Sequence, residues 1–173
     1  MSDSVTTPSL FGEDAPDTAI SKITLDDWKQ LDPEAQARLL ASRHPSKGHL
    51  NRQKNDSIEW AQHSWNPVTG CLHNCPYCYA RDIAEELYEE KFAPTLHLAR
   101  LDAPYRKPPA KAATDIGYGN IFVCSMADLF GQWVPKEWIE AVLRRVRDNP
   151  QWNFLFLTKF PLRLAEFEYP DNA

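Results

Sequence analysis

Three of the four cysteines in the chain lie within one short segment, CLHNCPYC, which runs from Cys71 to Cys78. Their C-x3-C-x2-C spacing allows a single loop to hold three thiolates against three corners of a cubane iron–sulfur cluster. A structural zinc site normally needs a fourth ligand, which a second cysteine or histidine pair supplies from a distance. His73 lies inside the same tight loop, where it cannot easily complete a tetrahedron. The spacing therefore favours an iron–sulfur cluster on Cys71, Cys75 and Cys78, with a zinc site or inert thiols as the alternatives.

The composition is that of a globular protein with one main domain. The chain has 173 residues, of which 43% are hydrophobic, so it can bury a substantial core. Its formal net charge of −5 means that any nucleic-acid contact would have to use a local basic patch. The N-terminus lacks the pattern of a secretory signal, and no apolar stretch approaches the roughly 18 residues of a membrane span. We therefore expect a cytoplasmic protein without membrane contact, in which a tight cysteine cluster is more often a metal or redox site than a disulfide framework.

Residues 1–56 are predicted to form an N-terminal extension. The segment 1–20 is rich in Ser, Thr, Pro and acidic groups, which is typical of a disordered tail. Two short helices are expected next, because Thr24 and Asp27 form a loose capping box and Asp32 precedes a proline at a second helix start.

The polar segment 44–56 completes this extension and is locally basic. We expect a linker there, and a phosphate-contacting arm is the alternative interpretation. Its basic side chains are those of His44, Lys47, His49, Arg52 and Lys54.

Residues 57–173 alternate between predicted strands and helices, which indicates an α/β fold with right-handed crossovers. Short apolar runs predict buried parallel strands over residues 64–68, 120–124 and 152–159. Helical patterns are present over residues 79–92, 135–147 and 160–167. Ile83 and Leu87 mark the apolar spacing of the first helix. The segment 94–119 contains four prolines and is long for a connection, so we expect an insertion there.

The cysteine loop directly follows the first predicted strand. It should therefore lie at the carboxyl edge of the parallel sheet, where α/β folds build their active sites. Ser125 and Asp128 follow the second strand, and Thr158 and Lys159 end the third. We expect all of these side chains at the same rim of the sheet.

With these motifs, the chain resembles the radical S-adenosylmethionine (radical SAM) enzymes, whose hallmark is C-x3-C-x-aromatic-C after the first strand of a partial (β/α)6 barrel. The aromatic position here is Tyr77. The segments IEWAQHSWNPVTGCLHNCPYCYAR, IFVCSMADLF and FLFLTKFP are similar to the phage-associated radical SAM proteins of unassigned function. Their cysteine loop is also similar to that of spore photoproduct lyase. The resemblance covers roughly residues 57–165 and implies that residues 57–173 form the N-terminal half of such a barrel, with the insertion packed over it.

The resemblance implies that Cys71, Cys75 and Cys78 bind three irons of a [4Fe-4S] cluster, whose fourth iron is chelated by the amino and carboxylate groups of SAM. An electron from an external donor would then cleave SAM to methionine and a 5′-deoxyadenosyl radical, which abstracts hydrogen from an unknown substrate. Tyr77 is expected either beside the adenine or over the cluster, where it would exclude water.

The remaining site residues carry weaker expectations. Ser125 and Asp128 stand where many relatives hold the SAM amino group with a Gly-Gly-Glu stretch, which this chain lacks. Asp128 is expected to accept a hydrogen bond from SAM or to cap a helix. Lys159, next to Thr158, is expected to contact the substrate or the SAM carboxylate, or to be solvated. Cys124 is expected to be a small buried hydrophobic residue.

Compared with the six-unit barrel, the sequence ends after about three strand–helix units. We expect such a half barrel to expose an unpaired parallel edge, which a completing partner chain would cover, and to be an incomplete form of an enzyme. Two alternative functions stay open. One is a nucleic-acid-acting enzyme similar to photoproduct lyase, supported by the basic segment 44–56, and the other is a non-catalytic metal-cluster binding module.

Overall fold

The computed structural model describes residues 20–41, 50–53 and 58–173. The predicted tail, apart from Ile20, and most of the basic segment 44–56 lie outside the described residues. Within these ranges, no helix is long and apolar enough to cross a membrane.

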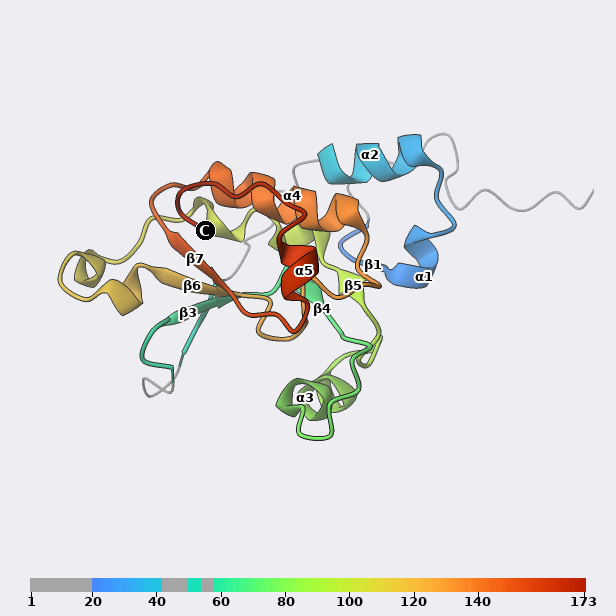
Figure 1. Cartoon of the computed structure of the whole chain (residues 1–173), viewed down its shortest axis with the longest axis horizontal. Helices are drawn as coiled ribbons and strands as arrows, with labels where there is room; N and C mark the ends of the chain where they lie inside the picture. The colour runs from blue at the N-terminus through green and yellow to red at the C-terminus, as the bar shows by residue number, and fades with distance from the viewer. Residues whose placement is uncertain (1–19, 42–49, 54–57) are drawn as a thin grey trace, which may run out of the picture.

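A four-stranded sheet forms the centre of the fold (Figure 1). Its strands lie in the order β2 (Asn51–Arg52), β3 (His63–Trp65), β6 (Asn120–Val123) and β7 (Asn153–Phe156). The last three are parallel and β2 is antiparallel to β3. The fold is therefore mixed α/β, as predicted, and the strands in the described ranges form no closed barrel. Because β2 falls inside the segment predicted as a linker, that interpretation is wrong for its two residues.

A second sheet is antiparallel and has three short strands. They lie in the order β1 (Ile23–Thr24), β5 (Thr95–Leu96) and β4 (Val68–Thr69). The single strand predicted over residues 64–68 is therefore wrong, since it is divided between β3 and β4. Pro67 has no N–H for a strand partner, and its carbonyl accepts a hydrogen bond from the His97 amide at 2.7 Å. The chain changes sheets at this proline.

The predicted insertion, residues 94–119, is part of the main core. It supplies β5 and then four short 3-10 helices, η1 (Leu98–Arg100), η2 (Ala103–Tyr105), η3 (Ala110–Ala113) and η4 (Ile116–Tyr118). Leu98, Leu101 and Ala103 are buried in the same hydrophobic cluster as the central strands. This segment does more than pack over the sheet, because it also provides the middle strand of the second sheet.

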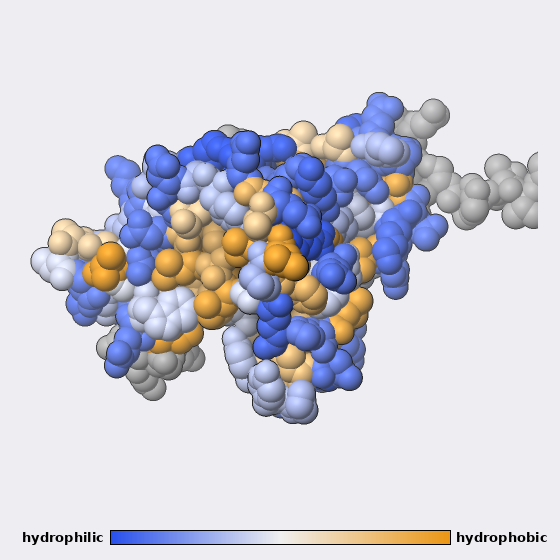
Figure 2. Space-filling view, in the orientation of Figure 1, coloured by the Kyte–Doolittle hydropathy of each residue, from blue (hydrophilic) through white to orange (hydrophobic). Residues whose placement is uncertain are grey.

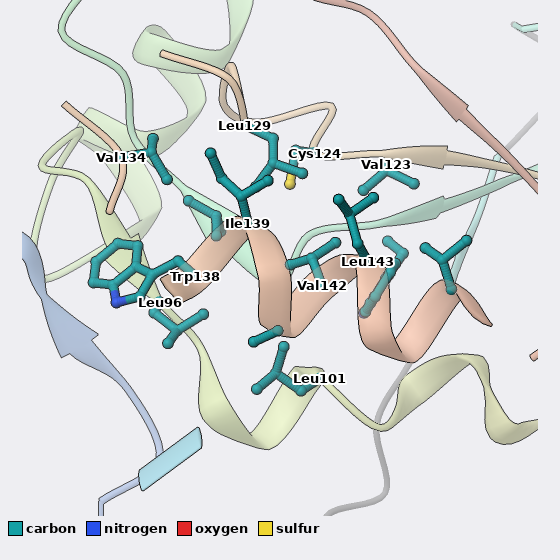
Figure 3. Close-up of a cluster of buried hydrophobic side chains, with 14 of the residues drawn as sticks. Leu96, Leu101, Val123, Cys124, Leu129, Val134, Trp138, Ile139, Val142 and Leu143 are labelled. Carbon is teal, nitrogen blue, oxygen red and sulfur yellow. The ribbon is translucent and has the colours of Figure 1, made fainter. Parts of the chain in front are cut away.

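Helix α4 (Lys136–Arg147) covers one face of the central sheet. Figure 3 shows its side chains Trp138, Ile139 and Val142 directed into a cluster that includes Val123 of β6. The helix predicted over residues 135–147 is confirmed. Cys124, directly after β6, is 2% exposed within this cluster, so the prediction of a small buried hydrophobic residue is also confirmed.

The two helices predicted in the N-terminal extension are present as α1 (Leu25–Trp28) and α2 (Pro33–Ala41). The Asp27 amide donates to Thr24 Oγ1 at 3.2 Å, which confirms the first predicted cap. The Ala35 amide donates to Asp32 Oδ1 at 2.7 Å, which confirms the second. Trp28 then packs edge-on against Trp138 of α4, with ring centroids 5.7 Å apart.

Helix α3 (Tyr79–Leu87) lies away from the central sheet (Figure 1). It buries Ala80 and Ala84 in a small cluster with Phe92. Ile83 and Leu87, predicted as its apolar face, are 40% and 68% exposed. The predicted face is therefore wrong. The helix instead packs its alanine side against Phe92 and Met126, where small side chains allow close contact.

The C-terminal residues cover part of the free edge of β7, after the short helix α5 (Pro161–Leu164). The Phe154 amide donates to the Asn172 carbonyl at 2.7 Å, on the side where a further strand would pair. Nδ2 of Asn172 also donates to the carbonyls of Val146, Asn149 and Trp152, each at 3.1 Å. The expectation of an unpaired edge is therefore wrong at this point.

Replacing Asn172 by Ala should destabilise the protein, because the carbonyls of Val146, Asn149 and Trp152 lose their side-chain amide donor. The backbone hydrogen bond to β7 is unchanged by this substitution. We expect the free energy of unfolding to fall by about 1–3 kcal/mol. Chemical denaturation followed by tryptophan fluorescence would measure this. The exposed neighbour Asp171→Ala is the matched control and should change stability by less than about 0.5 kcal/mol. Equal effects of the two substitutions would contradict the role of Asn172.

Candidate functional site

A pocket of ≈ 340 Å³ at the carboxyl ends of the central strands contains the predicted site residues. Those that line it are Cys71, Cys75, Cys78, Tyr77, Ser125, Asp128, Thr158 and Lys159. Phe122 and Leu157 add apolar surface to the lining. Figure 2 shows apolar side chains gathered over β6 and β7 on the visible face of the molecule. The structure thus brings together all the residues that the sequence assigned to the rim of the sheet.

The cysteine loop begins at Gly70, which sequence reasoning missed. Its φ is +81°, and a Cβ at this position would lie 2.1 Å from the Ala93 carbonyl oxygen, so only glycine fits without strain. The Gly70 amide donates to the Met126 carbonyl at 3.0 Å, and the Cys71 amide donates to the Phe92 carbonyl at 3.2 Å. A glycine directly before the first cysteine is the signal that could have identified this turn.

The same loop is held to α3 by a second positive-φ residue, Asn74, at φ 55°. Nη1 of Arg81, in the first turn of α3, donates to Asn74 Oδ1 at 2.5 Å. The Arg81 guanidinium also lies 5.6 Å from the Phe92 ring centroid. These contacts connect the middle of the cysteine loop to the helix that follows it.

Asn66, another residue that sequence reasoning missed, positions the loop after β6. Its Oδ1 accepts hydrogen bonds from Ser125 Oγ and from the Met126 amide, both at 3.1 Å. The hydroxyl of Tyr79 donates to the Ser125 carbonyl at 2.6 Å. The 125–128 loop is therefore fixed from two sides, by the β3–β4 connection and by α3.

Asp128 joins the loops that follow β6 and β7. Its Oδ1 accepts from the Phe130 amide at 3.1 Å and from Thr158 Oγ1 at 2.7 Å. Its Oδ2 accepts from the Lys159 amide at 2.9 Å. The residue is 8% exposed, so these bonds form with little competition from water. Three of its roughly four acceptor positions are occupied, and the second position on Oδ2 has no donor among the described residues.

Tyr77 and Lys159 lie together at the exposed side of the pocket. Lys159 Nζ donates to Tyr77 Oη at 3.4 Å and lies 5.4 Å from the centroid of its ring. The hydrogen bond to Tyr77, and then the negative charge of Cys75, raise the pKa of the Lys159 ammonium. A positive charge is therefore present beside the cysteine loop at neutral pH.

The three cysteines of the loop are free and half-buried. Burial raises the pKa of the Cys71 thiol, and backbone hydrogen bonds from His73 and Asp128 act in the opposite direction. Burial also raises the pKa of the Cys124 thiol to about 12, so Cys124 stays protonated at neutral pH. The loop cysteines, unlike Cys124, are accessible to a metal or a reagent.

His73 also lines the pocket, and its ring packs against Phe160 with centroids 5.4 Å apart. Across the described ranges, no three His, Cys, Asp or Glu side chains form a group that could hold a metal ion. The loop cysteines therefore share a pocket without forming a closed cage.

Comparison with known proteins identifies the family of the chain but assigns no activity to it. A family model described as "Protein of unknown function (DUF5131)" matches residues 55–172. The chain belongs to this family. No curated protein and no solved structure shows a significant match. The matched residues of the DUF5131 family include the whole cysteine loop and the loops after β6 and β7.

Replacing Asp128 by Asn should weaken the connection between the loops that follow β6 and β7 and so destabilise the protein. An amide group can present only one acceptor oxygen, so either the Lys159 amide or the pair formed by Thr158 and Phe130 loses its partner. We expect stability to fall by about 1–3 kcal/mol, measured by chemical denaturation. Asp171→Asn is the isosteric control on the exposed C-terminal segment. A stability of Asp128→Asn equal to that of the control would show that the carboxylate does not join the two loops.

Alkylation should distinguish the four cysteines of the native chain. With iodoacetamide at about pH 8, we expect modification of the three loop cysteines but not of Cys124, which is buried and protonated. Mass spectrometry of the digested protein would locate the labels, and the same reaction in denaturant would modify all four. Labelling of Cys124 in the native protein at the rate of Cys75 would contradict the described burial.

Proposed function

We propose that the protein is an iron–sulfur protein of the radical SAM type, in which Cys71, Cys75 and Cys78 bind a [4Fe-4S] cluster and its fourth iron binds SAM. The supporting observation is that the C-x3-C-x2-C loop shares one pocket with polar groups from the ends of two parallel strands. Those groups are Ser125, Asp128, Thr158 and Lys159.

The donor set suits a cluster with one open corner. The loop offers three free thiols. Cys124 lines the same pocket, but it is 2% exposed and packed in the main hydrophobic cluster, so we assign the cluster to the three loop cysteines alone. A closed structural zinc site would require a fourth ligand. Since the described side chains form no preformed metal-ion group, the support comes from the spacing of the cysteines and from their shared pocket.

Burial disfavours the thiolate of Cys71, and three groups around the loop offset part of that cost. The amides of His73 and Asp128 donate to Cys71, and hydrogen bonds of this kind stabilise thiolates and tune the potential of a bound cluster. The Lys159 ammonium acts on Cys75 from the other side. Three thiolates would otherwise repel one another in a half-buried loop.

The chain's own residues can orient SAM in this pocket. When bound and reduced, the cluster supplies the electron that cleaves SAM to methionine and a 5′-deoxyadenosyl radical. The second acceptor position on Asp128 Oδ2 suits the amino group of SAM, and the Lys159 ammonium suits its carboxylate. The main task of Asp128 is to hold the Thr158 and Lys159 loop beside the cysteines. Tyr77, which is 76% exposed, lies at the outer side, where it can cover a bound adenine.

Anaerobic reconstitution with iron and sulfide tests the proposal. We expect about four irons and four sulfides in the brown protein. Alanine at Cys71, Cys75 or Cys78 should abolish the chromophore, and Cys124→Ala is the matched control that should retain it. Loss of the cluster in the Cys124 variant would contradict the ligand assignment.

Activity is measured on the same samples by chromatography of 5′-deoxyadenosine after dithionite reduction. The loaded protein should form more product than its Cys75→Ala variant, even without the true substrate. A loaded cluster with no product above that background would contradict the radical reaction and favour the non-catalytic cluster-binding module instead.

A further inference from the structure

A second groove, of ≈ 920 Å³, lies at the end of the central sheet opposite to the cysteine loop. His63 begins β3, Tyr118 precedes β6 and Trp152 precedes β7, so the groove is at the amino ends of the parallel strands. In Figure 1, this end lies opposite to the end that carries α3 and α5. The proposed cluster chemistry does not use it.

The groove is basic, although the whole chain has a formal net charge of −5. Four exposed cationic side chains line it, those of Arg52, Arg106, Lys107 and Lys111. Arg52 comes from β2, and the other three come from the connection between β5 and β6. Segments distant in the sequence therefore bring like charges to one place.

Two of these cations meet at a single aromatic ring. The Arg52 guanidinium lies 5.8 Å from the Tyr118 centroid, and Lys111 Nζ lies 4.1 Å from it. Lys111 Nζ also donates to Tyr118 Oη at 2.9 Å. The two positive charges at this ring repel each other, and an anion bound between them would be attracted to both.

Among the described residues, a carboxylate lies within salt-bridge distance of one of these four cations. Lys111 Nζ lies 4.0 Å from Asp115 Oδ2. In the part of the chain that the structure describes, no salt bridge joins Arg52, Arg106 or Lys107 to a carboxylate. Burial, and then the charge of Arg52, lower the pKa of His63, so its ring is neutral at neutral pH. The Arg52 charge therefore acts across the groove without a counter-charge from the described side chains.

The backbone that carries Arg106 is held in place. Trp152 Nε1 donates to the carbonyls of Pro104 at 3.0 Å and Arg106 at 2.7 Å. Gln151 Nε2 donates to the same carbonyls at 3.1 and 3.3 Å. A segment that is already ordered loses less conformational entropy when it binds a ligand.

We propose that this groove binds adjacent phosphate groups of one ligand through Arg52, Arg106, Lys107 and Lys111. Planar guanidinium groups bind phosphate oxygens in pairs, and lysine adds unpaired positive charge. The spread of four cations around a large groove suits several phosphates better than a single one. A nucleotide diphosphate and the backbone of a single nucleic-acid strand both present such phosphates.

Binding of two probes to the full chain tests this proposal, one of them pyrophosphate in calorimetry. The other is a labelled oligothymidylate of about twelve nucleotides in fluorescence anisotropy. The triple variant Arg52→Gln, Arg106→Gln, Lys107→Gln should bind about tenfold or more weakly than the unchanged protein. The matched control removes the same charge from exposed positions of α4, as Lys136→Gln, Arg144→Gln, Arg147→Gln, and should retain affinity within about twofold.

The two probes distinguish the sources of phosphate. Tight pyrophosphate binding that displaces the oligonucleotide would support a small diphosphate ligand. Oligonucleotide binding alone would support a strand, and the salt slope of its affinity should fall by about two in the groove variant. The proposal is overturned if neither probe binds, if both triple variants lose affinity alike, or if an oligoglutamate peptide competes as well as pyrophosphate. None of these measurements needs a cluster, so they are independent of the cysteine-loop proposal.

Discussion

The parallel pairing of β3, β6 and β7 is the constraint on which the rest of the structure depends. Parallel strands end at one edge of the sheet and begin at the other, so the loops at each edge meet although they are distant in sequence. Each connection must also cross back over the sheet, and α4 does so between β6 and β7 while burying Ile121 and Phe154. The cysteine pocket and the basic groove therefore lie at opposite ends of one rigid sheet.

Polar contacts, more than apolar packing, hold the cysteine pocket together. Asn66 fixes the loop after β6, and Asp128 connects that loop to the residues after β7. By contrast, α3 buries little beyond Ala80 and Ala84, so the wall formed by the cysteine loop and α3 is the less firmly packed one. A wall of this kind can adjust to a bound group while the opposite wall keeps its shape.

The elements that could be predicted from the sequence are those with a strong local pattern. β6, β7 and α4 follow continuous apolar runs or helical spacing, and the caps at Thr24 and Asp32 follow short motifs. β2, β4 and β5 have only two residues each, which is too short for a periodic signal. Their pairing depends on partners distant in the chain. The apolar face of α3 was misassigned because spacing shows which residues share a face but not which face the fold covers.

The sequence by itself determined the spacing of the cysteines and the positions of Ser125, Asp128 and Lys159 at the ends of strands. These follow from local order along the chain, and they identified the residues of the pocket. Only the tertiary structure decided that the Asp128 carboxylate accepts three hydrogen bonds from the loops after β6 and β7. It also decided that Arg52 and Lys111 meet at the Tyr118 ring. Hydrogen bonds and electrostatic interactions depend on the distance between groups in space, so residues far apart in sequence acquire a common role only when the chain folds.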